Sequence, residues 1–204
     1  MVKNKNHWYD GKFYDKVIAP NQDKAFEIVK GLIKKQSVVV DVGCGTGRLS
    51  FQLREKCKRI DGIDLSERNI KVANRNLLLN PFDNVRFYHS DAESILKNNN
   101  YDYAVLSYVI HEIDEPDRVG LLKLLAGKAE KVIIVDYLVP RPKGFTNLIN
   151  GVVEFVAGKE HYNNFKSFVF NEGVKGLAKQ SGLKITKEIS NSPETTYIVV
   201  LERN

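Results

Sequence analysis

Apolar residues recur at two different spacings along the first part of the chain, and the spacings predict helices alternating with strands. Residues 23–33 carry apolar side chains three or four positions apart, as one face of a helix does. The continuous apolar run 38–40 follows, which is typical of a buried strand. Residues 48–56 fit a helix better than another strand. The first unit is therefore predicted to be strand, glycine-rich turn and helix.

The same alternation continues to about residue 137. Further strands are predicted at residues 59–64, 85–89, 103–107 and 131–137, with helices after Ser66, near Ala92 and around Val119. The strands are apolar throughout and do not alternate, which indicates a parallel sheet covered by helices on both faces. We therefore predict an α/β fold with a doubly wound sheet.

The C-terminal part follows a different pattern. A helix is predicted from about Asn171 to Gly182, and two strands follow at residues 183–189 and 195–201. Their short link is too small for a parallel crossover, which needs about a dozen residues or more. The two strands are therefore predicted to pair antiparallel.

Composition limits the kind of protein. With 204 residues and 43% hydrophobic residues, we expect a single domain spanning residues 1–204. No apolar run approaches the roughly 20 residues that span a bilayer, so no membrane partner and a cytoplasmic location are expected. Cys44 and Cys57 support neither a disulfide framework nor a four-ligand zinc site, and we expect no metal site.

The net charge of +6 could suggest a polyanionic partner. The basic residues are scattered among 25 acidic ones, which favours a solvated surface over an anion-attracting face. A nucleic-acid partner is therefore not favoured.

The segment from Asp41 to Gly47 carries the strongest chemical signal, an acidic residue followed by glycines at alternate positions. Glycine lets the backbone turn sharply and approach a ligand closely. In an open parallel sheet, ligands bind beyond the carboxyl ends of the strands, so a nucleoside is expected here. The glycine spacing departs from the dinucleotide pattern. Asp41 would repel a pyrophosphate but suits the ammonium and sulfonium groups of S-adenosylmethionine.

Asp64 ends the second predicted strand, about 20 residues beyond Asp41, where an acidic side chain can accept hydrogen bonds from ribose hydroxyls. The alternative is that Asp64 simply precedes a helix cap at Ser66.

Four segments in this order resemble the successive motifs of class I S-adenosylmethionine-dependent methyltransferases: 41–47, 64–66, 90–92 and 101–107. The resemblance implies a Rossmann-like, seven-stranded, mostly parallel sheet with an antiparallel last strand, and S-adenosyl-L-methionine as cofactor. The cofactor-binding residues that it implies are Asp41, Gly43, Cys44, Gly45, Gly47, Asp64, Leu65, Asp91, Ala92 and Ser107. The glycines would border the methionine part, Asp64 the ribose, Asp91 the adenine and Ser107 the reacting end. Asp91 could instead cap a helix, and Ser107 could simply end a strand.

Residues 107–113 resemble the small-molecule enzymes of the ubiquinone/menaquinone-biosynthesis type, and the chain lacks the Asn-Pro-Pro-Tyr or Asp-Pro-Pro-Tyr motif of amino-methylating enzymes. We therefore expect in-line methyl transfer to a small, partly apolar acceptor. His111 is the candidate general base, or else a histidine that holds its loop. An RNA or protein acceptor, a cofactor-binding protein without transferase activity and a nicotinamide-dependent oxidoreductase are the alternatives.

Two aromatic-rich segments are expected to cover the site. Residues 1–22 are interpreted as a lid with Tyr9 and Tyr14 as contacts, or else as core packing or a dimer contact. Residues 141–170 are interpreted as a substrate-capping insertion that includes an apolar helix from Leu148 to Val156. His161 and Tyr162 are its candidate substrate contacts, and an oligomer interface is the alternative. A monomer or homodimer is expected.

Overall fold

The computed structural model describes residues 22–140, 159–190 and 196–204. The predicted lid, with Tyr9 and Tyr14, lies outside the described residues, as do residues 141–158 of the predicted insertion. In the part of the chain that is described, no helix combines the length and the apolar character needed to cross a membrane.

Strands and helices alternate along most of the chain, as predicted. The strands are β1 (Val38–Val42), β2 (Arg59–Asp64), β3 (Val85–His89), β4 (Tyr101–Ser107), β5 (Ala129–Tyr137), β6 (Leu183–Ser190) and β7 (Thr196–Arg203). The helices are α1 (Asp23–Leu32), α2 (Arg48–Leu53), α3 (Glu67–Leu79), α4 (Ala92–Leu96), α5 (Glu115–Lys128), α7 (Lys159–Phe170) and α8 (Gly173–Ser181).

The strands form a seven-stranded sheet of order β3-β2-β1-β4-β5-β7-β6. β2 pairs in parallel with both β1 and β3, whereas β7 is antiparallel to both β5 and β6. The prediction of an α/β, doubly wound sheet with an antiparallel last strand is confirmed. The chain divides into two compact units, residues 1–105 and 106–204, and the expectation of a single domain stays a prediction.

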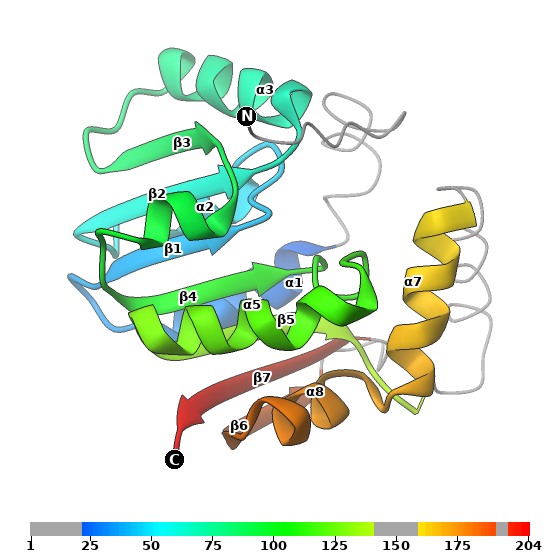
Figure 1. The fold of residues 1–204 in the computed structure, drawn as a ribbon. Coiled ribbons are helices and arrows are strands. Elements are labelled where there is room, and N and C mark those ends of the chain that lie inside the picture. Colours follow the sequence, from blue (N-terminus) through cyan, green and yellow to red (C-terminus); the bar gives the residue numbers. More distant parts are fainter. Residues whose placement is uncertain (1–21, 141–158, 191–195) are drawn as a thin grey trace. The chain divides into compact units, whose positions relative to one another are not determined.

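In the first unit, the parallel register brings the carboxyl ends of three strands to one edge. Val42 of β1 is level with Ile63 of β2, and Asp64 is level with His89 of β3. Figure 1 shows α3 lying along β2 and β3, with which it packs. Apolar residues of β1 and β2 fill the core beneath the helices, and Val39, Val40 and Ile60 are fully buried. The turns that follow these strands therefore leave the sheet side by side.

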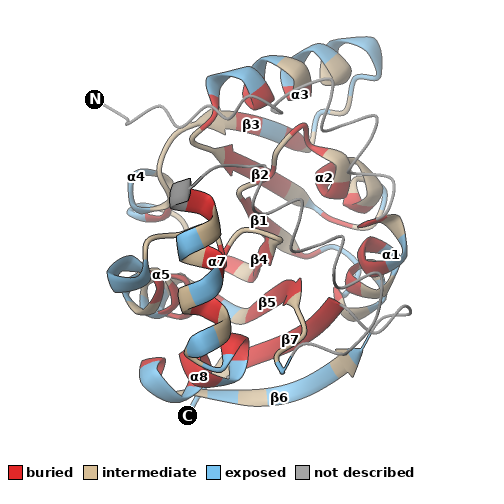
Figure 2. Ribbon diagram, turned by 90° about the vertical axis from the view of Figure 1, so that its right-hand side faces the viewer, coloured by how far each residue is buried: buried red, intermediate tan, exposed pale blue. Residues whose placement is uncertain are grey.

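In the second unit, β7 lies between β5 and β6, while α5 and α8 pack against the sheet (Figure 1). Figure 2 shows β7 largely buried and β6 largely exposed, as expected for a central strand and an edge strand. α7 buries Phe165 and Phe168 on the side that faces α5 and α8. α8 ends where Gly182 adopts a left-handed conformation, φ +70°, as predicted.

Helix boundaries differ from the predictions in three places. α2 ends at Leu53 and does not extend to residue 56. α5 begins at Glu115, a turn before the apolar residues from which it was predicted, because Pro116 is tolerated in the first turn of a helix. A separate helix, α7, precedes α8, which itself begins at Gly173 and not at about Asn171.

Candidate functional site

The glycine-rich turn after β1 has a backbone that other residues rarely adopt. Gly43, Gly45 and Gly47 have φ values of +72°, +55° and +85°. The amides of Gly43 and Cys44 both donate to the carbonyl oxygen of Ile63, at 2.7 and 3.0 Å. These bonds fold the turn back over the end of β2. The alternate glycines that the sequence singled out are therefore the positions where the turn needs left-handed backbone.

The ring of Phe87 packs directly against two glycines, Gly47 in this turn and Gly62 in β2. A Cβ atom on Gly47 would lie 2.4 Å from Phe87 Cζ, and one on Gly62 would lie 2.5 Å from Phe87 Cδ1. Both distances are far below ordinary van der Waals contact. Gly47 and Gly62 therefore let β3 support the turn through the Phe87 ring.

Asp64 connects the turn after β1 to the start of α3. Its Oδ2 accepts a hydrogen bond from the Gly45 amide at 2.8 Å, and its Oδ1 accepts one from the Ser66 amide at 2.7 Å. Ser66 in turn caps α3 by accepting from the Asn69 amide at 3.3 Å. The Asp64 side chain is half-buried, so part of it faces outward beside the glycine turn. The helix-cap interpretation is confirmed for Ser66, and the ribose contact of Asp64 stays a prediction.

Asp91 follows β3 at the same edge and caps α4. Its Oδ1 accepts from the Ser94 amide at 2.7 Å, and this hydrogen bond lowers the pKa of Asp91. Ala92, half-buried, is the first residue of α4. The ring nitrogen Nε2 of His89 lies 3.0 Å from the carbonyl oxygen of Leu65 and holds that segment against β3. The capping role of Asp91 is confirmed, while its contact with adenine is untested.

Asp41 lies in the interior beneath the turn. The carboxylate is fully buried and its Oδ2 accepts from the Ser50 hydroxyl at 2.7 Å, while its Oδ1 has no hydrogen-bond partner among the described residues. Burial raises the pKa of Asp41 to about 6, against the lowering effect of the Ser50 hydrogen bond, and the charge of Asp64 adds to the rise. The observed hydrogen bond of Asp41 thus joins the end of β1 to α2, and its predicted contact with the cofactor is untested.

Cys44 is also buried. Its Sγ lies 3.8 Å from the carbonyl oxygen of Gly45, and burial raises the pKa of the thiol. A thiol held in its neutral form is a poor nucleophile. The predicted contact of Cys44 with the cofactor is untested.

In the second unit, the segment after β4 carries His111, the predicted candidate base, which pairs with a buried aspartate. Ser107, half-buried, is the last residue of β4, and Tyr108 follows with a φ of +57°. His111 is 2% exposed, and its Nδ1 lies 2.7 Å from Asp136 Oδ1 at the end of β5. Asp136 is fully buried, so the two side chains form a polar pair in the interior.

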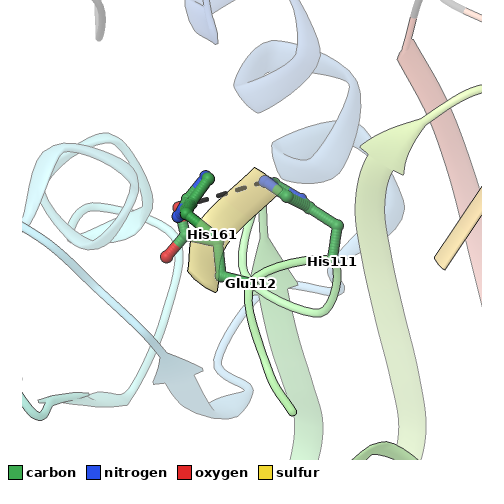
Figure 3. A group of neighbouring side chains, drawn as sticks. All are labelled: His111, Glu112 and His161. Carbon is green, nitrogen blue, oxygen red and sulfur yellow. Dashed lines mark ion pairs between the residues drawn. The ribbon is translucent and has the colours of Figure 1, made fainter. Parts of the chain in front are cut away.

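Glu112 and His161 complete a cluster around His111 (Figure 3). Glu112 Oε1 lies 3.9 Å from His111 Nε2 and 3.8 Å from His161 Nε2. The two imidazole rings are nearly perpendicular, with centroids 5.7 Å apart. The structure therefore brings two of the predicted residues, His111 and His161, into one cluster.

Hydrogen bonds from two side chains to backbone carbonyl oxygens hold this cluster in place. The buried guanidinium of Arg118 donates to the carbonyl oxygens of Ile113 at 2.9 Å, Asn164 at 2.6 Å and His111 at 3.4 Å. The side-chain amide of Asn164 donates to the Glu112 carbonyl at 3.0 Å. Arg118 and Asn164 thus join the segment after β4 to α7.

Four residues of this arrangement were missed by sequence reasoning. Glu112 was overlooked although it directly follows the predicted His111 in the chain. Asp136 had a detectable signal, because it is an acidic residue that follows the apolar run 132–135, as Asp41 follows 38–40. Arg118 and Asn164 had none, since their role depends on tertiary contacts.

Tyr162, a predicted substrate residue, is half-buried on α7, and the Nζ of Lys166 lies 4.7 Å from the centroid of its ring.

The edge of the first unit offers the groups that S-adenosylmethionine requires. Gly43 and Gly45 of the turn are half-buried, and so are Asp64, the last residue of β2, and Asp91, which follows the adjacent parallel strand β3. Carboxylate oxygens accept hydrogen bonds from ribose hydroxyls and from an amino group. The residues present therefore fit the cofactor that the sequence predicted.

Comparison with known proteins agrees with this fit. A family model described as a methyltransferase domain matches residues 33–171. Methionine S-methyltransferase of Hordeum vulgare is 28% identical over 183 residues, which cover 81% of this chain and 16% of that protein. A tRNA (uracil-5-)-methyltransferase homolog of Mus musculus is 32% identical over 110 residues, which cover 52% of this chain and 18% of that protein. The chain thus spans less than a fifth of the length of these two relatives.

Solved structures show the same fold. Magnesium protoporphyrin IX methyltransferase from Synechocystis PCC 6803, crystallised with bound S-adenosylmethionine, superposes with a TM-score of 0.64 at 17% identity. The match covers 100% of this chain and 88% of that one. By its match to the family model over most of its length, the chain belongs to the class I S-adenosylmethionine-dependent methyltransferase domain family.

Proposed function

We propose that the protein transfers a methyl group from S-adenosylmethionine to a small-molecule acceptor by in-line displacement. Family membership supports the cofactor and the type of reaction. The identity of the acceptor needs separate support, because the relatives named above include enzymes for methionine and for tRNA. Placement in the ubiquinone/menaquinone-biosynthesis-like branch belongs to this proposal and rests on the segment 107–113.

The observation that carries the small-molecule proposal is the aromatic surrounding of His111. Its ring centroid lies 4.9 Å from that of Tyr137, 6.0 Å from that of Phe165 and 6.2 Å from that of Phe168. Aromatic side chains around a small number of placed polar groups are typical of sites for small, partly apolar ligands. A polyanion such as RNA is instead recognised through basic residues on an exposed surface.

In this proposal, the residues of the first unit bind and orient the cofactor. The backbone of the glycine turn borders the methionine part, Asp64 accepts hydrogen bonds from the ribose, and Asp91 accepts one from the adenine amino group. Bound S-adenosylmethionine supplies an electrophilic methyl group on a sulfonium. Because transfer requires the acceptor atom to lie in line with that methyl, positioning and exclusion of water contribute most of what the protein must supply.

His111 has two roles that its geometry permits. Asp136 at Nδ1 fixes the ring, so Nε2 is the nitrogen at which His111 would take a proton from an acceptor. The second role is binding of a metal ion through the same nitrogen. The positions of Glu112 and His161 favour the second role, which is developed below.

Methyl transfer can be tested with S-adenosylmethionine that carries an isotopically labelled methyl group. The full chain is incubated with a panel of small thiols, phenols and amines, with total RNA and with a protein extract, and the fractions are separated. We expect label in the small-molecule fraction, and none with Asp64→Ala. Label in RNA or protein would overturn the acceptor class, whereas tight cofactor binding without label anywhere would indicate a binding protein. The cytoplasmic location and the monomer or homodimer state stay predictions.

A further inference from the structure

We propose that His111, Glu112 and His161 form a binding site for a divalent transition-metal ion of the zinc class. The three side chains converge from the segment after β4 and from α7 (Figure 3). The site shares His111 with the proposed acceptor surroundings, but it uses none of the residues proposed to bind the cofactor in the first unit. It also departs from the sequence-based expectation, which found no metal site because it considered only the cysteines.

The distances are close to those that a metal ion requires. One donor atom from each of the three side chains lies within 4.8 Å of the other two. A tetrahedral zinc ion with bonds of about 2.0–2.2 Å holds its ligand atoms about 3.4 Å apart. The Glu112 carboxylate, 3.8 and 3.9 Å from the two imidazole Nε2 atoms, needs to move by only a few tenths of an ångström on this scale. The donor nitrogens of the two imidazoles lie within 4.8 Å of each other and would also have to approach when an ion binds. Because its side chain is 34% exposed, Glu112 has room for this movement.

Asp136 provides the partner that a metal-bound histidine usually has. Metal-ligating histidines commonly donate their second ring N–H to a carboxylate, which fixes the tautomer and the orientation of the ring. His111 Nδ1 lies 2.7 Å from Asp136 Oδ1, and the His111 amide also donates to Asp136 Oδ2, at 3.4 Å. With Nδ1–H donated to Asp136, Nε2 is the nitrogen directed toward Glu112 and His161.

The backbone carrying the ligands is rigidly held, which reduces the entropic cost of binding an ion. Arg118 donates to the carbonyl oxygens on either side of Glu112, those of His111 and Ile113, and to that of Asn164 on α7. Asn164 donates to the carbonyl oxygen of Glu112 itself. The two segments that carry the ligands are therefore joined by hydrogen bonds that do not use the ligand side chains.

The ligand set indicates the kind of ion. Two imidazoles and one carboxylate suit zinc and similar transition metals, whereas magnesium and calcium prefer oxygen ligands alone. Three protein ligands with one remaining position are typical of catalytic zinc sites, and that position can take water or a donor atom of another ligand. Coordination through Nε2 would also remove that nitrogen from proton transfer.

The site can be tested by titrating the full chain, stripped of metal with a chelator, with zinc chloride and with magnesium chloride in a calorimeter. We expect one zinc ion per chain and no magnesium binding. Glu112→Gln keeps the size of the side chain but removes a charged ligand, and we expect it to weaken zinc binding by more than about 100-fold. Asp136→Asn is expected to weaken it by about 10–100-fold.

His89→Gln is the matched control, because His89 lies in the first unit outside the cluster, and it should bind zinc as the unchanged protein does. Circular dichroism of each variant establishes that it is folded. The proposal also predicts that zinc raises the melting temperature of the unchanged protein and of His89→Gln, but not that of Glu112→Gln. No zinc binding, equal binding by Glu112→Gln, or equal affinity for magnesium would each overturn the proposal.

Discussion

Replacing Asp41 by asparagine is expected to change how the stability of the protein depends on pH. Asp41 is fully buried, and its pKa is raised from 3.8 to about 6 in the folded protein. Below about pH 3 the carboxyl group is largely neutral in both the folded and the unfolded chain. Between about pH 4 and pH 6 the folded chain binds more protons than the unfolded one, so the free energy of unfolding falls as pH rises.

The size of this loss follows from the shift in pKa. Two pKa units at about 1.36 kcal/mol each give about 3 kcal/mol. Above about pH 7, burial of the ionised carboxylate lowers the free energy of unfolding of the unchanged protein by this amount. The asparagine side chain has no charge to bury, so the variant lacks this loss. The stability of Asp41→Asn relative to the unchanged protein should therefore increase by about 3 kcal/mol between pH 3 and pH 8. Any constant offset from altered hydrogen bonding with Ser50 does not affect this difference.

Urea unfolding, followed by circular dichroism at several pH values, measures the difference directly. Asp83→Asn, which removes an exposed carboxyl group, controls for the change in net charge and should shift stability by no more than about 0.5 kcal/mol at any pH. A difference between Asp41→Asn and the unchanged protein that stays constant with pH, or that shrinks as pH rises, would refute the reasoning.

Three further changes test packing and hydrogen bonding in the two units, each measured by urea unfolding. Gly62→Ala places a Cβ atom 2.5 Å from the Phe87 ring and should cost about 1–3 kcal/mol, and the added change Phe87→Leu should recover part of that loss. Arg118→Met leaves three carbonyl oxygens without their donor and should cost about 3 kcal/mol or more, and a cost below about 1 kcal/mol would contradict the bridging role. Asn84→Ala removes two hydrogen bonds to backbone carbonyls, of 2.7 and 2.8 Å, and should cost about 1–3 kcal/mol, whereas no loss would show that water replaces them.

The first half of the fold was predictable because local pattern and tertiary packing agree there. β2 and β3 have the bounds that were predicted for them. The turn after β1 was predictable for a physical reason, since alternate glycines in one short segment indicate left-handed backbone. The antiparallel pairing of β6 and β7 followed from the shortness of their link.

α7 shows where a sequence pattern is insufficient. Its buried residues His161, Phe165 and Phe168 have helical spacing, but one of the three is a polar residue. A histidine on the buried face interrupts the helical spacing of apolar residues from which a helix is predicted. Whether that histidine is buried depends on partners elsewhere in the chain. The same limit applies to the histidine cluster, since Asp136 meets His111 only through tertiary contacts.

The carboxylates show a second limit of sequence reasoning. Asp41, Asp64 and Asp136 each stand near the end of a predicted strand, yet their surroundings differ. Asp41 and Asp136 are fully buried, whereas Asp64 is half-buried and bonded to two backbone amides. Position along the chain predicts that such residues matter, but burial decides which of them can touch a ligand.

The most direct test of the central claim is calorimetric titration of the full chain with S-adenosylmethionine, its demethylated product and NAD, repeated on two variants. Asp64→Ala removes the carboxylate proposed to hold the ribose, and Glu67→Ala removes a neighbouring exposed charge at the start of α3. The account predicts that the first two ligands bind to the unchanged protein and to Glu67→Ala, that binding is lost in a folded Asp64→Ala, and that NAD does not bind. Preference for NAD, or unchanged binding of S-adenosylmethionine by Asp64→Ala, would contradict it.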